Sequence, residues 1–233
     1  MVLTGRRHSR GTIRSLIEAG IPIVEMWEMS DQPIDTVVGF SQRGTGERAA
    51  RHFAERGARR LGFVGAALDR DYRAADRHAG FVEAALQAGC EEPAAIRLPE
   101  RASGTAGAEG LARLMAAYPE VDAVLFSNDA LALGGLFEAQ RKGWAVPGRL
   151  KVCGFGDLEF AAATQPALTT IRPPRREIGA RIAEILRSRL TLIPQNGPRF
   201  AGEDDAEAKS PKQRAGPSGA FDLGFELVVR GSS

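Results

Sequence analysis

The sequence is poor in cysteine and has no long apolar run. Only Cys90 and Cys153 occur among 233 residues, so we expect neither a disulfide framework nor a cysteine-based zinc site. The first residues, MVLTGRRHSRGT, lack the apolar core of a signal peptide, and no apolar run approaches the ~20 residues that span a bilayer. Export and membrane insertion are disfavoured, and the cytoplasm is the expected location.

The chain also lacks an excess of charge of either sign. Lys and Arg total 31 and Asp and Glu total 29, which leaves a formal net charge of +2. No summed basic field is available to hold a nucleic acid without local clustering. The three histidines, His8, His52 and His78, are too far apart to suggest a metal pair, and each lies in a polar helical stretch. We therefore expect all three on the surface.

The motifs of common enzyme and DNA-binding classes are missing. There is no GxSxG elbow, SxxK pair, HExxH or P-loop, which disfavours an enzyme. Ser9 to Gly20 does not begin a helix-turn-helix, because the β-branched, proline-containing run Ile21 to Glu25 follows it. A recognition helix needs a polar face that can enter the major groove.

One glycine-rich segment imitates a dinucleotide-binding turn. Gly44 to Ala49 fits the pattern GxGxxA, follows an apolar strand and opens a helix. The match is weak, because three residues separate that strand from Gly44, whereas in a true turn the first glycine directly follows the strand and the backbone approaches a pyrophosphate. We expect Ser41 to cap the helix, the small residues to allow close helix packing, and no cofactor to bind.

Short apolar runs alternate with longer segments of helical period, which is the pattern of parallel βα units covered on both sheet faces. The predicted fold class is therefore α/β. The candidate strands are Val2–Thr4, Ile21–Glu25, Val37–Phe40, Arg60–Val64, Ala95–Leu98, Ala123–Phe126, Leu150–Gly154 and Phe225–Val229.

Two helices show an apolar stripe that we expect in the core. The stripe of the helix after Tyr72 consists of Ala75, Ala79, Val82 and Leu86. A later helix opens with Pro173 and Pro174, as helices tolerate at their start. Its stripe consists of Ile178, Ile182, Ile185 and Leu186.

The composition changes between Pro194 and Ala220, where Pro, Gly, Ser and charges dominate and Val, Ile and Leu are absent. Such a segment cannot bury enough apolar surface to offset its ordering entropy, so we expect a flexible loop. After it, large apolar residues alternate at period two and predict one final strand. These residues are Phe221, Leu223, Phe225 and Leu227.

The most informative segment runs from Asp122 to Gly179. In it a strand ends in Ser127-Asn128-Asp129, a helix follows, and VPxxLxVxGFxD leads to PALTTIRPP. This segment closely resembles the effector-binding domain of the lactose/galactose-repressor (LacI/GalR) family of bacterial transcription regulators. Further landmarks of the family are Val2–Gly5, Ala19–Val24, Val38–Phe40, Arg59–Gly65 and Asp222–Gly231. The resemblance is strongest to the gluconate-repressor branch, in Val24–Trp27, Val38–Ser41 and Gly154–Glu159.

The resemblance implies a fold like that of periplasmic sugar-binding proteins. Two α/β subdomains with parallel sheets are joined by crossover strands, and a small ligand binds at the carboxyl ends of the strands. The first subdomain is expected to comprise residues 1–57, 167–193 and 221–233, and the second residues 58–166. Residues 194–220 form the expected loop, and Leu168 to Arg172 cross back to the first subdomain.

Family members carry a helix-turn-helix domain, a hinge helix and two βα units before the strand that matches Val2–Thr4, and none of these lies in this chain. We therefore expect a fragment or a mispredicted start, with an incomplete first subdomain that exposes apolar sheet surface. Operator DNA would be bound only through the missing helix-turn-helix, and the full-length protein would be a homodimer.

The resemblance also points to effector-binding residues in the second subdomain. Arg77 stands three residues before Gly80-Phe81, where the family presents an arginine that can donate two hydrogen bonds to a carboxylate or to sugar hydroxyls. From the residues alone, Arg77 reads as an exposed helix arginine. Asn128 and Asp129 either cap a helix or face ligand hydroxyls.

Five further positions bear on the kind of ligand. Gly156 stands where many relatives have aspartate, with Asp157 next to it, so the usual acidic clamp on a neutral sugar is displaced or missing. The absence of this acidic clamp fits an acidic ligand better than a neutral sugar. In the first subdomain Trp27 is placed to stack on a sugar face, and Glu28 and Phe40 are looser candidates. Ordinary packing at strand ends is the alternative for these three.

The resulting hypothesis is an effector-sensing domain of a LacI-type repressor. A sugar or sugar acid, such as gluconate or a phosphorylated relative, shifts the domain between two states and undergoes no reaction. Two alternatives stay open at this point. One is a sugar-binding protein for transport, and the other is an NAD-dependent enzyme built on the turn from Gly44 to Ala49.

Overall fold

A computed structural model describes residues 1–190 and 219–233 of the chain. Contacts between Cα atoms divide it into two compact units. Unit 1 comprises Met1–Phe40 and Arg175–Leu223, and unit 2 comprises Ser41–Pro174 and Gly224–Ser233. The chain therefore passes between the units three times, after Phe40, Pro174 and Leu223.

Unit 1 is built on a four-stranded parallel sheet in the order β1-β2-β3-β9. Its elements are β1 (Val2–Thr4), α1 (Arg10–Glu18), β2 (Val24–Met26), β3 (Thr36–Gly39), α6 (Arg175–Leu190) and β9 (Gly219–Asp222). The predicted stripe of α6 is confirmed, because Ile178, Ile182 and Ile185 are buried. Buried Arg189 ties the end of α6 to β3, since it pairs with Asp35 at 2.6 Å and donates to Thr36 Oγ1 at 2.9 Å.

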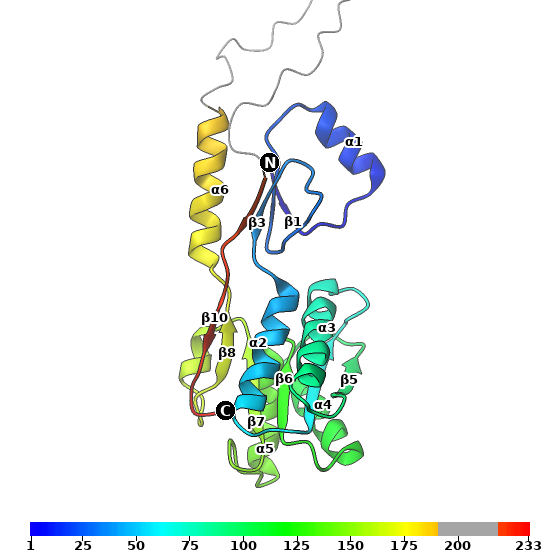
Figure 1. Cartoon of the computed structure of the whole chain (residues 1–233), viewed down its shortest axis with the longest axis vertical. Helices are drawn as coiled ribbons and strands as arrows, with labels where there is room; N and C mark the ends of the chain where they lie inside the picture. Colours follow the sequence, from blue (N-terminus) through cyan, green and yellow to red (C-terminus); the bar gives the residue numbers. More distant parts are fainter. Residues whose placement is uncertain (191–218) are drawn as a thin grey trace, which may run out of the picture. The chain divides into compact units, whose positions relative to one another are not determined.

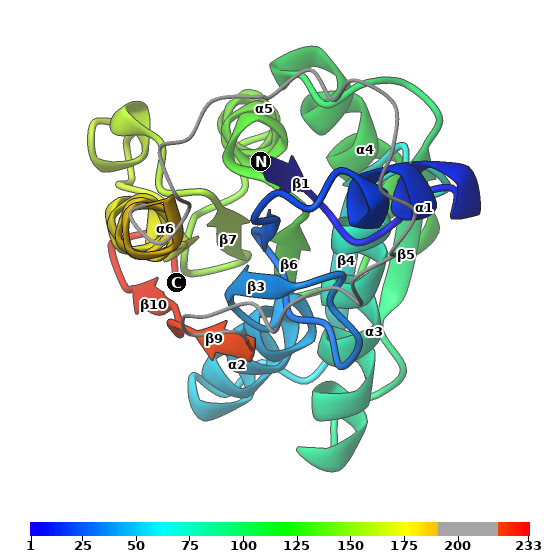
Figure 2. The ribbon, with the colours of Figure 1, turned by 90° about the horizontal axis from the view of Figure 1, so that it is seen from above.

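Unit 2 is built on a six-stranded sheet in the order β10-β8-β7-β6-β4-β5, in which only β10 runs antiparallel to its neighbour. Figure 2 shows β7, β6, β4 and β5 side by side. The strands are β4 (Leu61–Ala66), β5 (Ala94–Leu98), β6 (Ala123–Phe126), β7 (Lys151–Phe155), β8 (Thr169–Arg172) and β10 (Glu226–Val228). The helices are α2 (Gln42–Glu55), α3 (Tyr72–Gln87), α4 (Gly104–Ala117), α5 (Asp129–Arg141) and the 3₁₀ helix η1 (Glu159–Ala162).

The sheet of unit 2 separates two hydrophobic cores, as expected for a sheet that is covered on both faces. One core contains Phe53 of α2 and Phe81 of α3, and the other contains Leu114 of α4 and Leu131 of α5. The α/β class with parallel sheets is thus confirmed. Each of the eight predicted strands overlaps an observed strand, with ends shifted by up to three residues.

The division into compact units differs from the predicted subdomains at three segments. Residues 41–57, 167–174 and 224–233 were assigned to the first subdomain, whereas their contacts place them in unit 2. The reason is that α2 packs against α3, and β8 pairs with both β7 and β10. The predicted loop at 194–220 lies outside the described residues, except for Gly219 and Ala220, which begin β9.

The final predicted strand is wrong in its continuity. The period-two run from Phe221 to Leu227 divides into β9, which pairs with β3, and β10, which pairs with β8 in the other sheet. The break falls at Leu223 to Phe225, where Gly224 has φ of +66°. Alternating apolar residues indicate an extended chain, but they do not indicate which sheet accepts it.

The predicted core stripe of α3 is also wrong. Ala79 and Leu86 are exposed, Leu86 by 51%. The buried face consists of Ala74, Arg77, Gly80, Phe81, Ala84 and Ala85. A hydropathy pattern counts Arg77 as a surface residue, and this moved the predicted stripe to a neighbouring face of the helix.

Helices α2 and α3 pack at very short range through two glycines, and they lie beside each other in Figure 1. A Cβ atom at Gly46 would lie 1.8 Å from the carbonyl oxygen of Arg77, and one at Gly80 would lie 2.1 Å from that of Arg43. Ser41 Oγ accepts a hydrogen bond from Gly44 N at 2.9 Å and caps α2. The prediction of a capped helix with small packing residues is confirmed.

We expect Gly46→Ala to destabilise the protein by about 1 to 3 kcal/mol, because the added methyl group overlaps the backbone of α3. Urea unfolding followed by circular dichroism measures the change. Gly179→Ala in α6 is the matched control, since nothing lies within 4 Å of its Cβ position. It should be neutral or stabilising by up to about 1 kcal/mol, as for glycine in an open helix interior. Equal effects of the two substitutions would contradict the close-packing argument.

The prediction that all three histidines lie on the surface is wrong for His52. Its side chain is 2% exposed, and Nε2 lies 2.8 Å from Ser233 Oγ. Burial, together with the nearby positive charges of Arg56 and Arg48, lowers the pKa of His52 to about 4. The chain therefore folds around a neutral imidazole.

The depressed pKa of His52 predicts a loss of stability in acid. Folding favours the neutral ring, so this contribution is complete above the unfolded pKa of 6.5 and is lost as the pH falls through about 4. The full shift corresponds to up to about 3 kcal/mol. Urea unfolding at pH 7 and pH 4.5 should show a smaller acid loss for His52→Gln than for the natural chain. His8→Gln, whose ring is partly exposed, should retain the full loss.

Candidate functional site

The candidate site of unit 2 lies at the carboxyl ends of its parallel strands, where α/β sheets bind ligands. Strand β6 ends before Ser127 and Asn128, and β7 ends before Gly156 and Asp157. Strand β8 ends at Arg172. Because β6, β7 and β8 are parallel neighbours, these residues share one edge of the sheet.

Arg77 is buried rather than exposed, at 5% of its side-chain surface. Nη1 donates to Gln42 Oε1 at 2.5 Å, and Nη2 donates to the carbonyl oxygen of Ser127 at 2.9 Å. The guanidinium carbon lies 3.9 Å from the centre of the Phe155 ring. Burial lowers the pKa of Arg77 to about 10, so the group keeps its charge at neutral pH.

The partners of Arg77 satisfy it only in part. Among residues 1–190 and 219–233, no carboxylate lies within ion-pair distance of its guanidinium, and the buried Nε has no hydrogen-bond partner. Buried cations usually have a paired anion, since neutral oxygen acceptors offset less of the desolvation cost. Arg77 therefore provides an incompletely paired positive charge beside the end of β6.

Gln42, Ser127 and Phe155 around Arg77 were not predicted from the sequence. Gln42 is the first residue of α2, and the close contact at Gly46 holds α2 against the backbone of Arg77. The sequence signal that bears on these contacts is the pattern of small residues from Gly44 to Ala49. This pattern indicates that the helix packs closely against a neighbour, but it does not identify α3 as that neighbour.

Asn128 is the N-cap of α5, since its Oδ1 accepts a hydrogen bond from Leu131 N at 3.0 Å. The capping interpretation is thus confirmed. In the part of the chain that the structure describes, no hydrogen bond occupies the amide nitrogen of Asn128, and the side chain is partly exposed. That nitrogen can donate to an additional acceptor.

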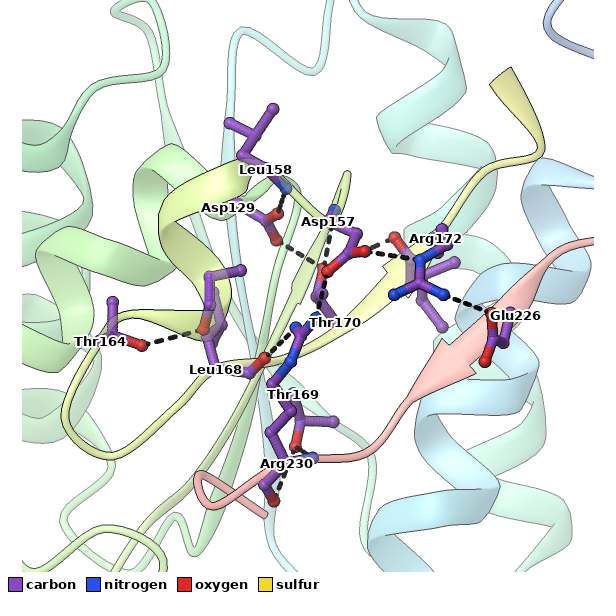
Figure 3. Close-up of polar contacts among 12 residues, drawn as sticks. Asp129, Asp157, Leu158, Thr164, Leu168, Thr169, Thr170, Arg172, Glu226 and Arg230 are labelled. Carbon is purple, nitrogen blue, oxygen red and sulfur yellow. Dashed lines mark hydrogen bonds and ion pairs between the residues drawn. The ribbon is translucent and has the colours of Figure 1, made fainter. Parts of the chain in front are cut away.

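Asp129 is fully buried, and both of its oxygen atoms are engaged (Figure 3). Oδ1 accepts from Thr170 Oγ1 at 2.6 Å, and Oδ2 accepts from Leu158 N at 2.7 Å. The adjacent strand must carry glycine at 154, because a Cβ there would lie 2.2 Å from Asp129 Oδ1. Asp129 thereby joins the start of α5 to β8 and to the loop after β7.

Asp157 lies between two arginines, as Figure 3 shows. Oδ2 accepts from Arg172 Nε at 2.6 Å, and Oδ1 accepts from Arg230 Nη2 at 2.7 Å. Arg172 Nη1 also donates to Glu226 Oε2 at 2.8 Å. Burial alone would raise the pKa of Asp157, but the hydrogen bonds from Arg172 and Arg230 lower it below its ordinary value. This carboxylate is occupied by protein groups.

The backbone conformation at Gly156 explains why no acidic side chain stands there. Gly156 has φ of +133°, which residues with a Cβ rarely adopt, and its N–H donates to Ile171 O at 2.8 Å. Asp157 follows with φ of +48°. The turn directs the carboxylate of Asp157 towards Arg172 and Arg230.

The candidate residues of unit 1 lie near the ends of β2 and β3. Trp27, with φ of +81°, meets Phe40 edge to face at 6.2 Å between ring centres. Glu28 is 1% exposed, and its Oε2 lies 3.5 Å from Arg6 Nε. A Cβ at Gly39 would lie 2.4 Å from Glu28 O, so the three candidates are held together around a glycine contact. Phe40 is fully buried, which fits a packing role.

The comparisons with known proteins agree with this geometry. A family model, the periplasmic binding protein-like domain, matches residues 50–215. The transcription regulator GntR from Chromobacterium violaceum, a solved structure, is 36% identical with a TM-score of 0.82, over 100% of this chain and 77% of that chain. A LacI family regulator from Silicibacter pomeroyi is 29% identical with a TM-score of 0.83, over the same shares. The chain belongs to the LacI family of transcription regulators.

Membership of the LacI family confirms the resemblance drawn from the sequence. The HTH-type transcriptional regulator GntR of Pseudomonas aeruginosa is 40% identical over 100% of this chain and 62% of its own length. The chain thus spans somewhat less than two thirds of that regulator. These relatives are transcription regulators, which weighs against the alternatives of a transport protein and an NAD-dependent enzyme.

Two further findings concern the described residues alone. Within 1–190 and 219–233, no group of three or more His, Cys, Asp or Glu side chains is arranged to hold a metal ion. No helix in the same ranges combines the length and the apolar character needed to cross a membrane.

We expect Asp129→Ala to destabilise the protein by about 2 to 3 kcal/mol, because it removes the acceptors of the buried Thr170 hydroxyl and of Leu158 N. Asp129→Asn keeps one acceptor oxygen and should cost less. Asp69→Ala is the control, since that side chain is 72% exposed. Chemical unfolding compares the three variants, and an Asp129→Ala variant as stable as Asp69→Ala would refute the structural role.

Proposed function

We propose that the chain is the effector-binding domain of a LacI-type transcriptional regulator and that its effector is a small sugar acid such as gluconate. The observation that carries the acidic effector is Arg77, a buried cation whose described partners are an amide oxygen, a carbonyl oxygen and an aromatic face. A carboxylate of the effector supplies the missing anion.

The chemistry of guanidinium supports this assignment. The Nε–H and one Nη–H bond of arginine point in parallel and match the two oxygens of a carboxylate. In Arg77 the Nη1 and Nη2 atoms each have one described acceptor, and Nε has none. A neutral hydroxyl beside the guanidinium of Arg77 would leave its buried charge unpaired. Contact with Arg77 therefore favours a sugar acid over the corresponding neutral sugar.

The acidic groups nearby do not oppose an anion. Asp129 and Asp157 have both oxygens engaged, and Asp157 is neutralised by two arginines. The conformation at Gly156 excludes a further carboxylate. The amide nitrogen of Asn128 provides a donor for an effector hydroxyl.

Trp27 and Glu28 of unit 1 remain proposed effector contacts, and the buried Phe40 remains a proposed site residue with an indirect role. The partly exposed ring of Trp27 suits stacking on a sugar face, and Glu28 suits a sugar hydroxyl. Phe40 contributes through its edge-to-face contact with Trp27. The positive φ of Trp27 supports this role, because strained residues cluster where ligands bind.

The proposed mechanism is a population shift without chemistry. The effector binds one of two conformations more tightly and thereby changes operator affinity. Operator DNA is bound by a helix-turn-helix domain of the same protein, as the name of the Pseudomonas relative indicates for that regulator. We further propose that the regulator works in the cytoplasm as a homodimer, without a cofactor.

Isothermal titration calorimetry of the 233-residue chain with gluconate, 6-phosphogluconate and glucose tests the proposal. At least one of the acids should bind at least tenfold more tightly than glucose, which corresponds to about 1.4 kcal/mol. Arg77→Gln should weaken binding of that acid at least tenfold and leave glucose binding nearly unchanged. Arg73→Gln, one turn earlier on α3, is the matched control.

Two outcomes would refute the acidic-effector proposal. If both acids and glucose bind equally, or if Arg77→Gln binds the preferred acid like the natural chain, the acidic-effector proposal is wrong. Urea unfolding of each variant establishes that a lost signal reflects binding and not loss of the fold.

A further inference from the structure

A hollow lies in unit 2, away from the partners of Arg77. It is formed by the loop between β4 and α3, by α3 itself and by the end of β5. Its volume of about 560 Å³ lies within the ~300 to 1,000 Å³ typical of small-molecule sites. We call it the α3–β5 hollow and define it by the residues discussed below.

The lining of the α3–β5 hollow is mainly apolar, with a few polar groups. The apolar lining includes Leu68, Ala75, Ala79 and Leu98. The polar groups are Asp69, His78 and Arg97. An apolar wall with few polar groups is the usual composition of a site that binds a small organic molecule.

One of these polar groups has an unsatisfied buried atom, and another is a cation without an ion pair. The ring of His78 lies 4.5 Å from that of Phe63, and its buried Nε2 has no hydrogen-bond partner among the described residues. Arg97 is exposed and has no ion pair in the described ranges. A buried polar atom without a partner is uncommon in folded proteins, and His78 is part of the lining of the hollow.

The charges of the lining favour an anion. Arg97 contributes a free positive charge, and Asp69 is the one acidic residue of the lining. The carboxylate of Asp69 lies 3.5 Å from Arg70 Nε, so its charge is offset locally. Burial and the charge of Arg97 lower the pKa of His78, which keeps its ring neutral and able to donate one hydrogen bond.

The wall of the hollow is held in place by backbone hydrogen bonds. Ala67 N donates to Leu98 O at 2.7 Å and joins the loop after β4 to the end of β5. Asp71 N donates to Ala67 O at 2.8 Å and joins the same loop to the start of α3. The two sides of the hollow therefore cannot separate without breaking these bonds.

We propose that the α3–β5 hollow is a second ligand site, which binds a small organic carboxylate with a compact branched or cyclic apolar body. The carboxylate contacts Arg97 and His78, and the apolar body packs on Leu68, Ala75, Ala79 and Leu98. This site is distinct from the one around Arg77, and the inference does not depend on the proposed effector.

The test is a titration of the 233-residue chain with cyclohexanecarboxylate, observed through the histidine ring protons by NMR. The chain has three histidines, so single substitutions assign each signal. We expect a saturable shift of the His78 signal, while the signals of His8 and His52 stay in place. Absence of a saturable shift at His78 overturns the proposal.

Two further ligands test the chemistry without any substitution. Cyclohexylmethanol has the same body without the charge, and it should bind at least tenfold more weakly. Inorganic phosphate has charge without the apolar body, and it should give no saturable shift at the same concentration. Equal binding of the alcohol, or saturation by phosphate, contradicts the proposed ligand class.

Variants then locate the site. Arg97→Gln should weaken binding at least tenfold, whereas Arg113→Gln, at an exposed arginine of α4 that does not line the hollow, should not. Ala79→Phe should fill the hollow from an exposed position of α3 and abolish binding, whereas Gln87→Phe, exposed on α3 outside the hollow, should not. Arg77→Gln should still bind cyclohexanecarboxylate, so failure here is distinguishable from failure of the effector proposal.

Discussion

The backbone contact between α2 and α3 at Gly46 and Gly80 sets the environment of Arg77. With a Cβ at either glycine the helices must separate, since it would lie about 2 Å from a carbonyl oxygen of the other helix. At the observed approach Gln42 reaches the guanidinium, and α3 presents Arg77 to Ser127 and Phe155. Glycine in a helix costs up to about 1 kcal/mol of stability relative to alanine, and this is the cost of the close approach of the two helices.

At the same edge of the sheet, the acidic side chains are bound by other groups of the protein. Asp129 bonds to β8 and to the loop after β7, and Asp157 pairs with Arg172 and Arg230. The oxygens of both carboxylates accept hydrogen bonds from the protein, and two cations also neutralise Asp157, so neither needs a ligand. Arg77 differs because its partners are neutral oxygens. The electrostatic asymmetry of the edge therefore arises from which groups the fold pairs, and not from the net count of charges.

The sequence predicts the positions of the strands and helices better than it predicts which side chains contact one another. Apolar runs located the strands because strands buried on both faces need apolar side chains throughout, and α6 followed from its isoleucine spacing. The same hydropathy rule failed on α3, where Arg77 is buried, and at His52, which lies against Ser233. Arg77 and Asn128 entered as candidates through the family resemblance. The arginine partners of Asp157 were out of reach, because they come from β8 and from the segment after β10 and meet only in the folded sheet.

Arg77 and His78 show how one helix contact controls two environments. Consecutive helix residues point about 100° apart, so a helix that buries position 77 directs position 78 to a different side. Rotating α3 to pair either residue better would move Gly80 away from Arg43 and Gly46 away from Arg77 O. The close approach of the two helices would then be lost. The partly paired guanidinium and the unpartnered imidazole nitrogen are therefore not independent defects, because both follow from the orientation of α3 that the close contact with α2 imposes.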